Sequence, residues 1–175
     1  ARETRGEEMV DRYANLVYRL AFARTRSRDA ADEIFQEVFL RYVSRQPAFD
    51  SEAHAKAWFC RVTVNCANSY WRNPFRRRTE PLDAAAELAA PEPEEARLDG
   101  YLDKLPPELR AAVHLYYYEG YSTPEIAELV GKSESAVRMR LMRARRLLRG
   151  YLEDEEGGTS HVSRCLPAPP GRRPP

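Results

Sequence analysis

The sequence predicts an all-α protein in which two small helical domains are joined by a flexible linker. Three observations support this prediction. Apolar side chains recur at helical spacing in the first part of the chain, an acidic stretch with three prolines interrupts the pattern, and two amphipathic segments follow around a single glycine. We place the domains at residues 1–79 and 101–152, the linker at residues 80–100 and a disordered tail at residues 153–175.

The 175-residue chain has a formal net charge of only +1, but its charges are unevenly distributed. Residues 1–79 carry 15 basic and 10 acidic side chains and residues 101–150 carry 9 and 6, whereas the linker carries 1 basic and 7 acidic side chains. About 20 flexible residues have an average span of roughly 25 Å. The two basic blocks could therefore reach separate sites on one partner.

The composition argues against membrane proteins, disulfide-rich proteins and metal-dependent proteins. The sequence has no run of 18 apolar residues and no apolar leader segment, so we expect no membrane insertion and a cytoplasmic location. Cys60, Cys66 and Cys165 form no C-x-x-C pair, which fits a reducing compartment. His161 and Cys165 are only two candidate ligands, whereas zinc needs three or four, so we predict no metal and no cofactor.

The first predicted helix spans residues 7–24 and is followed by a break between Arg24 and Ser27. Ser27 can cap a second helix, which reads DAADEIFQEVFLRYV. Its predicted buried side chains are Ile34, Phe35, Val38 and Tyr42, with Phe39 at the edge. The opposite side carries Asp32, Glu33, Gln36, Glu37 and Leu40. An exposed leucine ringed by acidic and amide groups indicates a partner surface, although a plain solvated face fits the same pattern.

A third helix is predicted after a loop at residues 45–53, and it has two different faces. The predicted packing face comprises Trp58, Val62, Cys66 and Ser69. The other face carries the hydrogen-bond donors Arg61, Asn65, Asn68 and Arg72, with Trp71 beside them and Arg76, Arg77 and Arg78 following. Aromatic rings and guanidinium planes stack on unpaired bases, and a basic run follows the phosphate backbone. We therefore predict a surface for single-stranded nucleic acid, with a wetted helix face as the alternative.

Residues 121–149 predict two further helices joined by a tight turn. Ser122 and Glu125 can form a capping box, and Gly131 can stop this helix because glycine tolerates the left-handed conformation. Ser133 can then cap a helix whose buried stripe is Val137, Leu141, Ala144 and Leu148. Two helices around such a turn form a helix-turn-helix, which places its second helix in the major groove of DNA.

Arginines dominate the exposed sides of this second helix. A basic amphipathic helix alone also fits a membrane-surface or calmodulin-binding segment, but the capped partner helix and the short turn favour DNA. Residues near its N-terminus are placed for contact with base edges, and later arginines for contact with phosphates. The base-edge candidates are Ser133, Glu134, Ser135 and Arg138, the phosphate candidates are Arg143, Arg145, Arg146 and Arg149, and Arg140 flanks the buried stripe.

Three segments in this order resemble a known protein family. DAADEIFQEVFLRYV is similar to the polymerase-clamp-binding helix of bacterial RNA polymerase sigma factors, and KAWFCRVTVNCANSYWR is similar to their promoter-melting helix. The segment LDKLPPELRAAVHLYYYEGYSTPEIAELVGKSESAVRMRLMRARRLL is similar to their fourth region. Over residues 7–152 the chain thus resembles the small, two-domain, extracytoplasmic-function (ECF) group of the sigma-70 family. The resemblance implies a region 2 helical bundle and a region 4 helix-turn-helix.

The resemblance implies a factor that directs core RNA polymerase to promoters and helps to open the DNA. It implies docking on the clamp coiled coil and flap of the polymerase, promoter DNA as a second partner, and an anti-sigma factor as a candidate inhibitor. The implied polymerase-binding residues are Asp32, Gln36, Glu37, Phe39 and Leu40. The implied minus-10 residues are Arg61, Asn65, Asn68, Trp71, Arg72, Arg76 and Arg77, with residues 46–53 and Asn65 holding a flipped base. The implied minus-35 residues are Ser133, Glu134, Ser135, Arg138, Arg140, Arg143, Arg145 and Arg146.

The rival interpretation is a helix-turn-helix transcriptional regulator that binds duplex DNA without polymerase docking. It shares residues 101–152 but leaves Gln36, Leu40 and the Asn65 stripe unexplained. The chain also departs from the family at one position, since Ser69 stands where family members often have aspartate. In either interpretation the chain is not an enzyme, and no catalytic residues are predicted.

Overall fold

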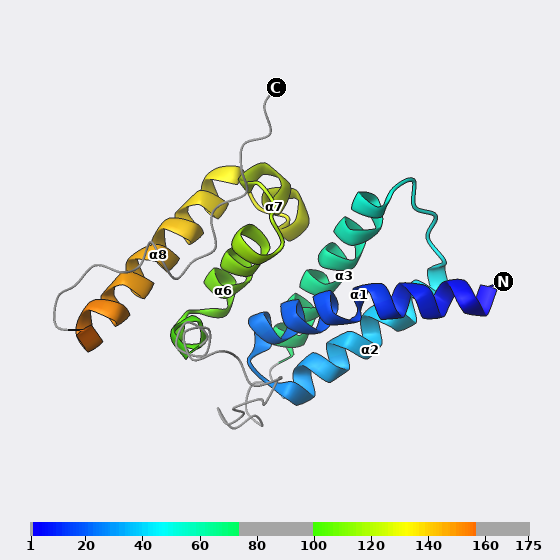
Figure 1. Cartoon of the computed structure of the whole chain (residues 1–175), viewed down its shortest axis with the longest axis horizontal. Coiled ribbons are helices and arrows are strands. Elements are labelled where there is room, and N and C mark those ends of the chain that lie inside the picture. Colours follow the sequence, from blue (N-terminus) through cyan, green and yellow to red (C-terminus); the bar gives the residue numbers. More distant parts are fainter. Residues whose placement is uncertain (1, 74–99, 157–175) are drawn as a thin grey trace. The chain divides into compact units, whose positions relative to one another are not determined.

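The computed structural model describes residues 2–73 and 100–156, and the chain divides into two compact units, Ala1–Ala85 and Ala86–Pro175. Every element in the described residues is helical (Figure 1), which confirms the predicted all-α fold. Within these two ranges, no helix has the length and apolar character needed to cross a membrane. Most of the predicted linker, Arg76 to Arg78 and the segment with His161 and Cys165 lie outside the described residues.

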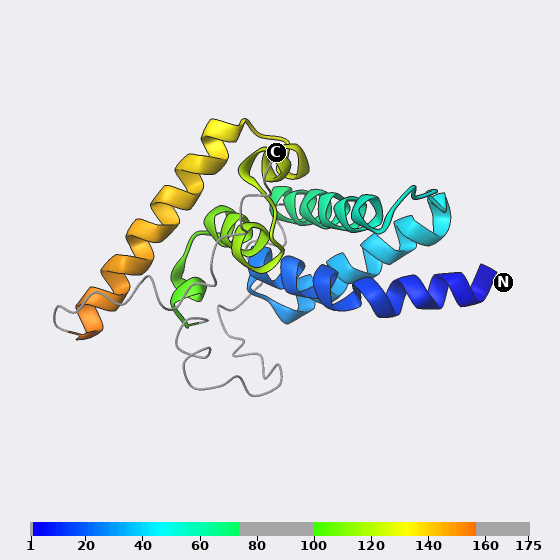
Figure 2. The same cartoon turned by 45° about the horizontal axis from the view of Figure 1, so that its top comes forward.

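The first unit is a bundle of three helices, α1 (Arg2–Thr25), α2 (Arg28–Arg45) and α3 (Glu52–Arg72). Each helix contacts the other two, and Figures 1 and 2 show them side by side. Phe59 of α3 is fully buried, with its ring centroid 4.6 Å from that of Tyr13 on α1 and 5.5 Å from that of Phe39 on α2. One aromatic ring from each helix therefore meets at the centre of the core.

Local side-chain chemistry sets the ends of these helices. α1 begins at Arg2, earlier than the predicted residue 7, and the break before α2 narrows to Arg26 and Ser27. The Ser27 hydroxyl accepts a backbone N–H of the first turn of α2 at 3.2 Å, as predicted. Ser51 caps α3 in the same way, at 3.1 Å. The short polar residues of the two connections therefore determine where α2 and α3 start.

The packing face of α3 differs from the prediction. Ser69 is exposed and Trp58 and Val62 are only partly buried, although Cys66 is buried. α3 contacts both α1 and α2, so its buried arc is wider than a single stripe, and its centre is displaced by one residue, or about 100°. The buried residues of α3 are Ala55, Phe59, Cys60, Thr63, Val64, Cys66, Ala67 and Tyr70.

The second unit contains α6 (Pro107–Val113), the π-helical turn η1 (His114–Tyr118), α7 (Thr123–Val130) and α8 (Glu134–Glu156). α6 and α7 both pack on α8, which is the longest of these helices (Figures 1 and 2). The predicted stripe Val137, Leu141, Ala144 and Leu148 is buried. α8 continues beyond the predicted boundary at residue 152 because Leu152 is also buried. Residues 153–156 belong to α8, so this helix extends past the residue at which we predicted the tail to begin.

The start of α7 and the turn between α7 and α8 have the predicted chemistry. The backbone N–H and the hydroxyl of Ser122 donate to Glu125 Oε2 at 2.8 and 2.7 Å, and the capping box is complete. Gly131 ends α7 with a φ of +66°, and Ser133 accepts a backbone N–H of α8 at 3.2 Å. The predicted helix-turn-helix is therefore present.

We expect Gly131→Ala to destabilise the second unit by about 1 kcal/mol, because alanine is strained at positive φ even where nothing lies near the added Cβ. The matched control is Gly150→Ala, which is also in open space but lies within α8. It should stabilise the unit by about 1 kcal/mol. Urea unfolding followed by far-UV circular dichroism measures both variants, and equal stability would contradict this explanation of the turn.

The turn η1 was not indicated by any pattern in the sequence. The Glu119 N–H donates to the carbonyl of His114 at 3.1 Å, which is five residues back and therefore one residue wider than an α-helical turn. This turn carries Tyr116 and Tyr117, whose rings lie beside the guanidinium of Arg145 on α8. The wider turn therefore contributes directly to how the helix-turn-helix is held.

Candidate functional site

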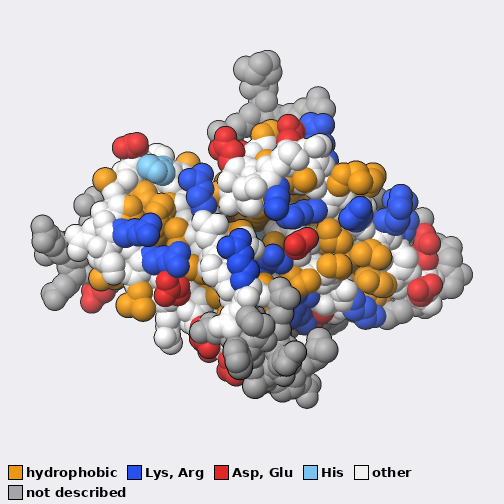
Figure 3. Space-filling model, turned by 180° about the vertical axis from the view of Figure 1, so that it is seen from behind, with side chains coloured by type: hydrophobic (Ala, Val, Ile, Leu, Met, Phe, Trp, Pro, Cys, Tyr) orange, Lys and Arg blue, Asp and Glu red, His pale blue; other side chains and the backbone are white. Residues whose placement is uncertain are grey.

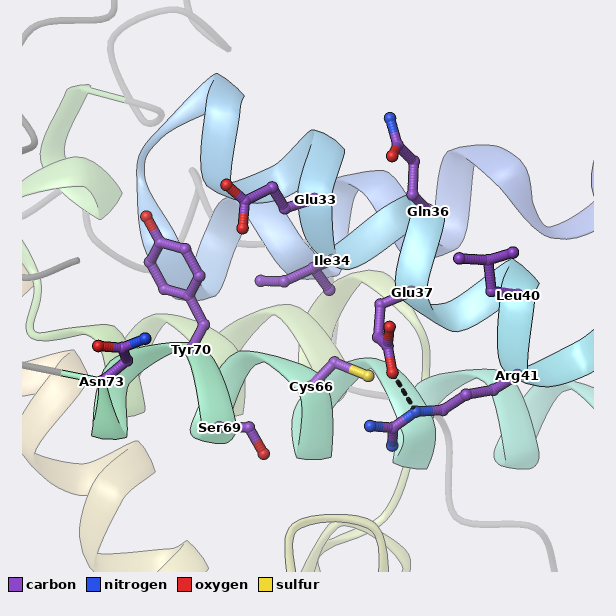
Figure 4. Close-up of a pocket in the computed structure, with 10 residues that line it drawn as sticks. All are labelled: Glu33, Ile34, Gln36, Glu37, Leu40, Arg41, Cys66, Ser69, Tyr70 and Asn73. Carbon is purple, nitrogen blue, oxygen red and sulfur yellow. Dashed lines mark hydrogen bonds and ion pairs between the residues drawn. The ribbon is translucent and has the colours of Figure 1, made fainter. Parts of the chain in front are cut away.

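A groove of about 420 Å³ lies between α2 and α3 of the first unit (Figure 4). Its lining residues are Glu33, Ile34, Gln36, Glu37, Leu40, Arg41, Cys66, Ser69, Tyr70 and Asn73. Leu40 is 62% exposed, and the neighbouring carboxylate of Glu37 accepts from Arg41 Nε at 2.7 Å. An exposed leucine therefore lies among acidic and amide groups, as the sequence pattern predicted. Such a surface suits a partner that offers an apolar recess and basic side chains.

The five predicted polymerase-binding residues do not all reach this surface. Gln36, Glu37 and Leu40 line the groove, and Asp32 is exposed on the same helix. Phe39 is only 8% exposed, and its ring centroid lies 5.5 Å from that of Phe59 in the core. The prediction of Phe39 as a contact residue is corrected accordingly, because its side of α2 is already covered by the rest of the bundle. Phe39 supports α2 from inside.

Val43 belongs to the same exposed face and was missed by sequence reasoning. It is 59% exposed and follows Leu40 by three residues, a spacing that places two side chains on one side of a helix. Helical spacing from Leu40 would have found it. The apolar part of this face therefore consists of Leu40 and Val43.

Cys66 forms part of the groove lining but is itself 4% exposed. Burial raises the pKa of its thiol, with the nearby Arg41 acting in the opposite direction to a smaller extent. A thiol with a raised pKa stays protonated and weakly nucleophilic near neutral pH. Cys66 is therefore not a candidate nucleophile in this groove.

The donor face of α3 is exposed at Arg61, Asn65 and Arg72, as predicted. Asn68 is partly buried, and its Oδ1 accepts from Arg24 Nη2 at 2.9 Å. Trp71 is also partly buried, and its indole N–H donates to the Arg24 carbonyl at 3.1 Å. Arg24, at the end of α1, was not among the predicted residues. Arg24 thus holds Asn68 and Trp71 in position through hydrogen bonds. These bonds join residues more than 40 positions apart, so the sequence alone did not indicate them.

The loop at residues 46–51 borders a second hollow, of about 580 Å³, that Met9 and Tyr13 of α1 also line. Asn65 is not among the residues that line this hollow. At 1.5 Å per residue, Asn65 lies about 15 Å along α3 from Ala55, the last residue of that helix among those that line it. The structure therefore does not bring Asn65 to this hollow. The expectation that the loop and Asn65 together bind one flipped base is not supported by this geometry.

α8 presents much of its positive charge away from α6 and α7. The exposed members of the predicted minus-35 set are Ser133, Ser135, Arg138, Arg143 and Arg146. Glu134 is partly buried, and its Oε1 accepts from Thr123 Oγ1 at 3.0 Å and from Arg138 Nη2 at 2.5 Å. Basic side chains also lie among apolar ones on the face of the molecule drawn in Figure 3. The start of α8 therefore has both hydroxyl groups and cations available for a polyanion.

Arg140 and Arg145 contact other helical segments of the unit, unlike the exposed arginines of the predicted minus-35 set. Arg140 lies 3.7 Å from Glu108 on α6, and Arg145 donates from Nε to the Tyr117 hydroxyl at 2.8 Å. The guanidinium of Arg145 also lies 5.8 Å from the ring centroid of Tyr116. Both side chains are partly buried. They connect α8 to α6 and η1, so we do not include them among the exposed cations of α8.

Met139 and Met142 are two further exposed residues that sequence reasoning missed. Each is 45% exposed, although the apolar stripe on the other side of α8 is buried. They lie among Ser135, Arg138, Arg143 and Arg146 on the outward face of the helix. The surface of α8 is therefore mixed, with apolar side chains between the cations.

Two family models match the chain, in the predicted order. "Sigma-70 region 2" matches residues 9–78, and "Sigma-70, region 4" matches residues 95–148. The chain belongs to the sigma-70 family. The two matches correspond to the three-helix unit and the helix-turn-helix unit. A helix-turn-helix regulator without polymerase docking is not favoured, because it offers no account of the region 2 match.

Curated relatives place this sigma-70 protein in the ECF group. The ECF RNA polymerase sigma factor SigE of Mycolicibacterium smegmatis is 34% identical over 165 residues, which cover 88% of this chain and 64% of SigE. The ECF RNA polymerase sigma factor SigM of Mycobacterium tuberculosis is 30% identical over 152 residues, which cover 83% of this chain and 78% of SigM. The probable RNA polymerase sigma factor RfaY of Xanthomonas campestris is 34% identical, and this chain spans 38% of its length. The chain therefore spans less than two thirds of SigE and of RfaY.

A solved structure has the same fold. The sigma factor RpoE of Bartonella quintana, in a complex with the anti-sigma factor NepR, matches with a TM-score of 0.68 over 84% of this chain and 96% of RpoE. The two sequences are 19% identical. At this identity the likeness concerns the fold alone.

Proposed function

We propose that the chain is an ECF-type sigma factor that binds core RNA polymerase, directs it to specific promoters and helps to open the DNA for initiation. One observation carries the proposal. A single three-helix unit offers both a docking groove on α2 and a donor face on α3, in a chain that also contains a helix-turn-helix. A regulator that only binds duplex DNA would need the last of these alone. The factor would act in the cytoplasm and without a cofactor, and the catalytic chemistry would belong to the polymerase.

The proposed polymerase contact is the exposed face of α2. Leu40 and Val43 would enter an apolar recess on the clamp coiled coil, and the carboxylates of Asp32 and Glu37 would face basic side chains around it. Gln36 would add amide hydrogen bonds. The helix-turn-helix unit would contact the flap. We assign residues 1–79 to polymerase docking and minus-10 recognition, residues 80–100 to the linker and residues 101–152 to minus-35 recognition.

The proposed contact with the opened strand is the donor face of α3. Extruding and unstacking a base costs a few kcal/mol, so the strand must gain contacts in the separated state that the duplex does not make. Stacking on an aromatic ring supplies about 1–3 kcal/mol per base, and Trp71 is the ring beside this face. Arg61, Asn65 and Arg72 would bind the backbone and base edges. Arg76 and Arg77 would extend this contact and lie outside the described residues.

The proposed contact with the minus-35 element is the outward face of α8. Ser133, Ser135 and Arg138 lie in the first turns of the helix, where the second helix of a helix-turn-helix meets base edges. Arg143 and Arg146 would neutralise phosphates, which gives affinity and salt dependence without sequence preference. Glu134 would orient Arg138 through the hydrogen bond between them.

Run-off transcription with bacterial core RNA polymerase over a library of promoter fragments tests the proposal. We expect transcripts that depend on the chain and on a common pair of upstream elements. Permanganate should also detect unpaired thymines near the start site. Retardation of duplex fragments with neither transcripts nor reactive thymines would support the regulator instead.

The double variant Arg61→Ala with Arg72→Ala should reduce open-complex formation while leaving the binding of upstream duplex unchanged. If each arginine neutralises one phosphate of a single strand, the log–log salt slope of strand binding should fall by about 0.7 for each residue. The matched control is Arg19→Ala, which removes an exposed arginine from α1 of the same unit. Filter binding at several salt concentrations measures the slope, and an unchanged slope in the double variant would exclude these two contacts.

An anti-sigma factor is a further proposed partner. The complex of RpoE with NepR supports it, because that protein has the same fold. The exposed face of α2 and the basic face of α8 are the surfaces that such an inhibitor would need to cover. Consistent recovery of free, transcriptionally active protein from its native host would count against this partner.

A further inference from the structure

Two methionines lie on the outward face of α8, where a polar surface would be expected. Met139 and Met142 are each 45% exposed, whereas Val137 and Leu141 beside them on the helix are at most 2% exposed. At 100° per residue, Met139 lies about 200° and Met142 about 140° around the helix from Val137. The two methionines are therefore not part of the core, and core packing does not explain them.

The charges around the methionines indicate what covers them. Arg138, Arg143 and Arg146 are exposed on the same face of α8, so the apolar pair lies between cations. An apolar spot flanked by arginines matches the major groove of DNA, which has phosphates along both edges and a single kind of apolar group on its floor. That group is the 5-methyl of thymine. A protein recess would instead need acidic side chains at matching positions.

The position of the pair along α8 agrees with this partner. Met139 and Met142 are the sixth and ninth residues of α8, which begins at Glu134 immediately after the tight turn. This is the part of the second helix that enters the groove in a helix-turn-helix. The two residues are separated by about 4.5 Å along the helix axis, compared with about 3.4 Å for each base pair of duplex DNA. Their side chains can therefore reach neighbouring base steps.

We propose that Met139 and Met142 are specificity-determining residues that read thymine 5-methyl groups in the major groove of the upstream promoter element. The inference rests on the proposed function, because it assumes that α8 binds duplex DNA there. It adds a component of recognition that hydrogen-bond donors cannot supply, since a methyl group accepts no hydrogen bond. The preferred element should therefore contain thymine at two neighbouring or next-neighbouring positions, on either strand.

The test uses deoxyuridine, which differs from thymidine only in lacking the 5-methyl group. The full chain, free and assembled with bacterial core RNA polymerase, first selects its preferred duplex from a randomised library. Each thymine of that duplex is then replaced in turn by deoxyuridine. We expect two positions at which the replacement weakens wild-type binding about fourfold, which corresponds to one buried methyl group. Met139→Ala should remove this thymine preference at one position and Met142→Ala at the other.

The ratio of thymine to uracil affinity is the decisive readout, because a general loss of binding leaves it unchanged. Met9→Ala is the matched control, since it removes the same kind of side chain but from α1 of the first unit, and it should retain both preferences. A preferred duplex without thymine, or equal binding of thymine and uracil at every position, would overturn the proposal and leave the proposed function intact. If neither free chain nor holoenzyme selects any duplex and no transcript forms, the proposed function fails with it.

Discussion

Leu40→Asp is expected to weaken binding to bacterial core RNA polymerase at least about 100-fold. Burying a leucine side chain contributes roughly 1.5–3 kcal/mol, and an aspartate in its place would add an unpaired carboxylate to the interface. The existing carboxylate of Glu37 lines the same groove one helical turn away and would increase the repulsion. Because Leu40 is 62% exposed, the substitution should leave the fold intact. Titration of fluorescently labelled chain with core polymerase measures the effect.

The matched control for this prediction is Asn15→Asp. It introduces the same charge at an exposed position of the same unit, but on α1. We expect its affinity for the polymerase to stay within about twofold of the wild-type value. Val43→Ala should have an intermediate effect, because it removes part of the apolar contact without adding charge. Wild-type affinity in Leu40→Asp would exclude the α2 face as the docking surface.

Phe59→Ala is expected to unfold much of the first unit. Truncating a fully buried phenylalanine costs about 3–5 kcal/mol, against a typical domain stability of about 5–15 kcal/mol. Here the cost should lie at the upper end, because the ring contacts Tyr13 of α1 and Phe39 of α2 as well as Trp58 of its own helix. Both tryptophans of the chain, Trp58 and Trp71, belong to this unit. Urea unfolding followed by tryptophan fluorescence therefore reports the first unit alone.

Phe22→Ala provides the control for the core prediction. It removes the same aromatic ring from a partly buried position on α1. There the ring of Phe22 stacks on that of Tyr18, with 6.5 Å between the ring centroids. Its cost should not exceed about 1.5 kcal/mol, because less apolar surface returns to water. In Phe59→Ala the second unit should also keep its binding to upstream duplex DNA. Similar losses of stability in the two variants would mean that Phe59 is not the centre of the core.

The helix-turn-helix could be predicted from the sequence because its signals are local. Ser122 and Glu125 satisfy each other within one turn, Gly131 adopts its left-handed conformation without outside help, and Ser133 caps the next helix through its own first turn. None of these interactions depends on where the rest of the chain lies. The same reasoning located the cap Ser27 at the start of α2. The periodicity of α8 likewise located the buried stripe of that helix.

Local signals could not predict which residues of α3 are buried, or that Phe39 is buried in the core. A single stripe was expected for α3, but α1 and α2 cover it together, and sequence periodicity cannot state how many neighbours a helix has. Phe39 lay at the edge of a predicted face, where a small change in packing decides between contact and core. Contacts between distant segments were equally hidden, as in the bonds from Arg24 to α3 and from Arg145 to η1.

The π-helical turn at His114–Tyr118 constrains the length of the chain and not only its side chains. An ordinary α-helical turn would close one residue earlier, so deleting a single residue here would convert the π-helical turn into an α-helical one and shift the side chains that remain in it around the helix. Tyr117 would then point away from Arg145, and α8 would lose its hydrogen bond to the helix behind it. Substitutions in this segment should therefore be tolerated far better than single-residue deletions, and homologous chains should vary in composition here while keeping the same residue count.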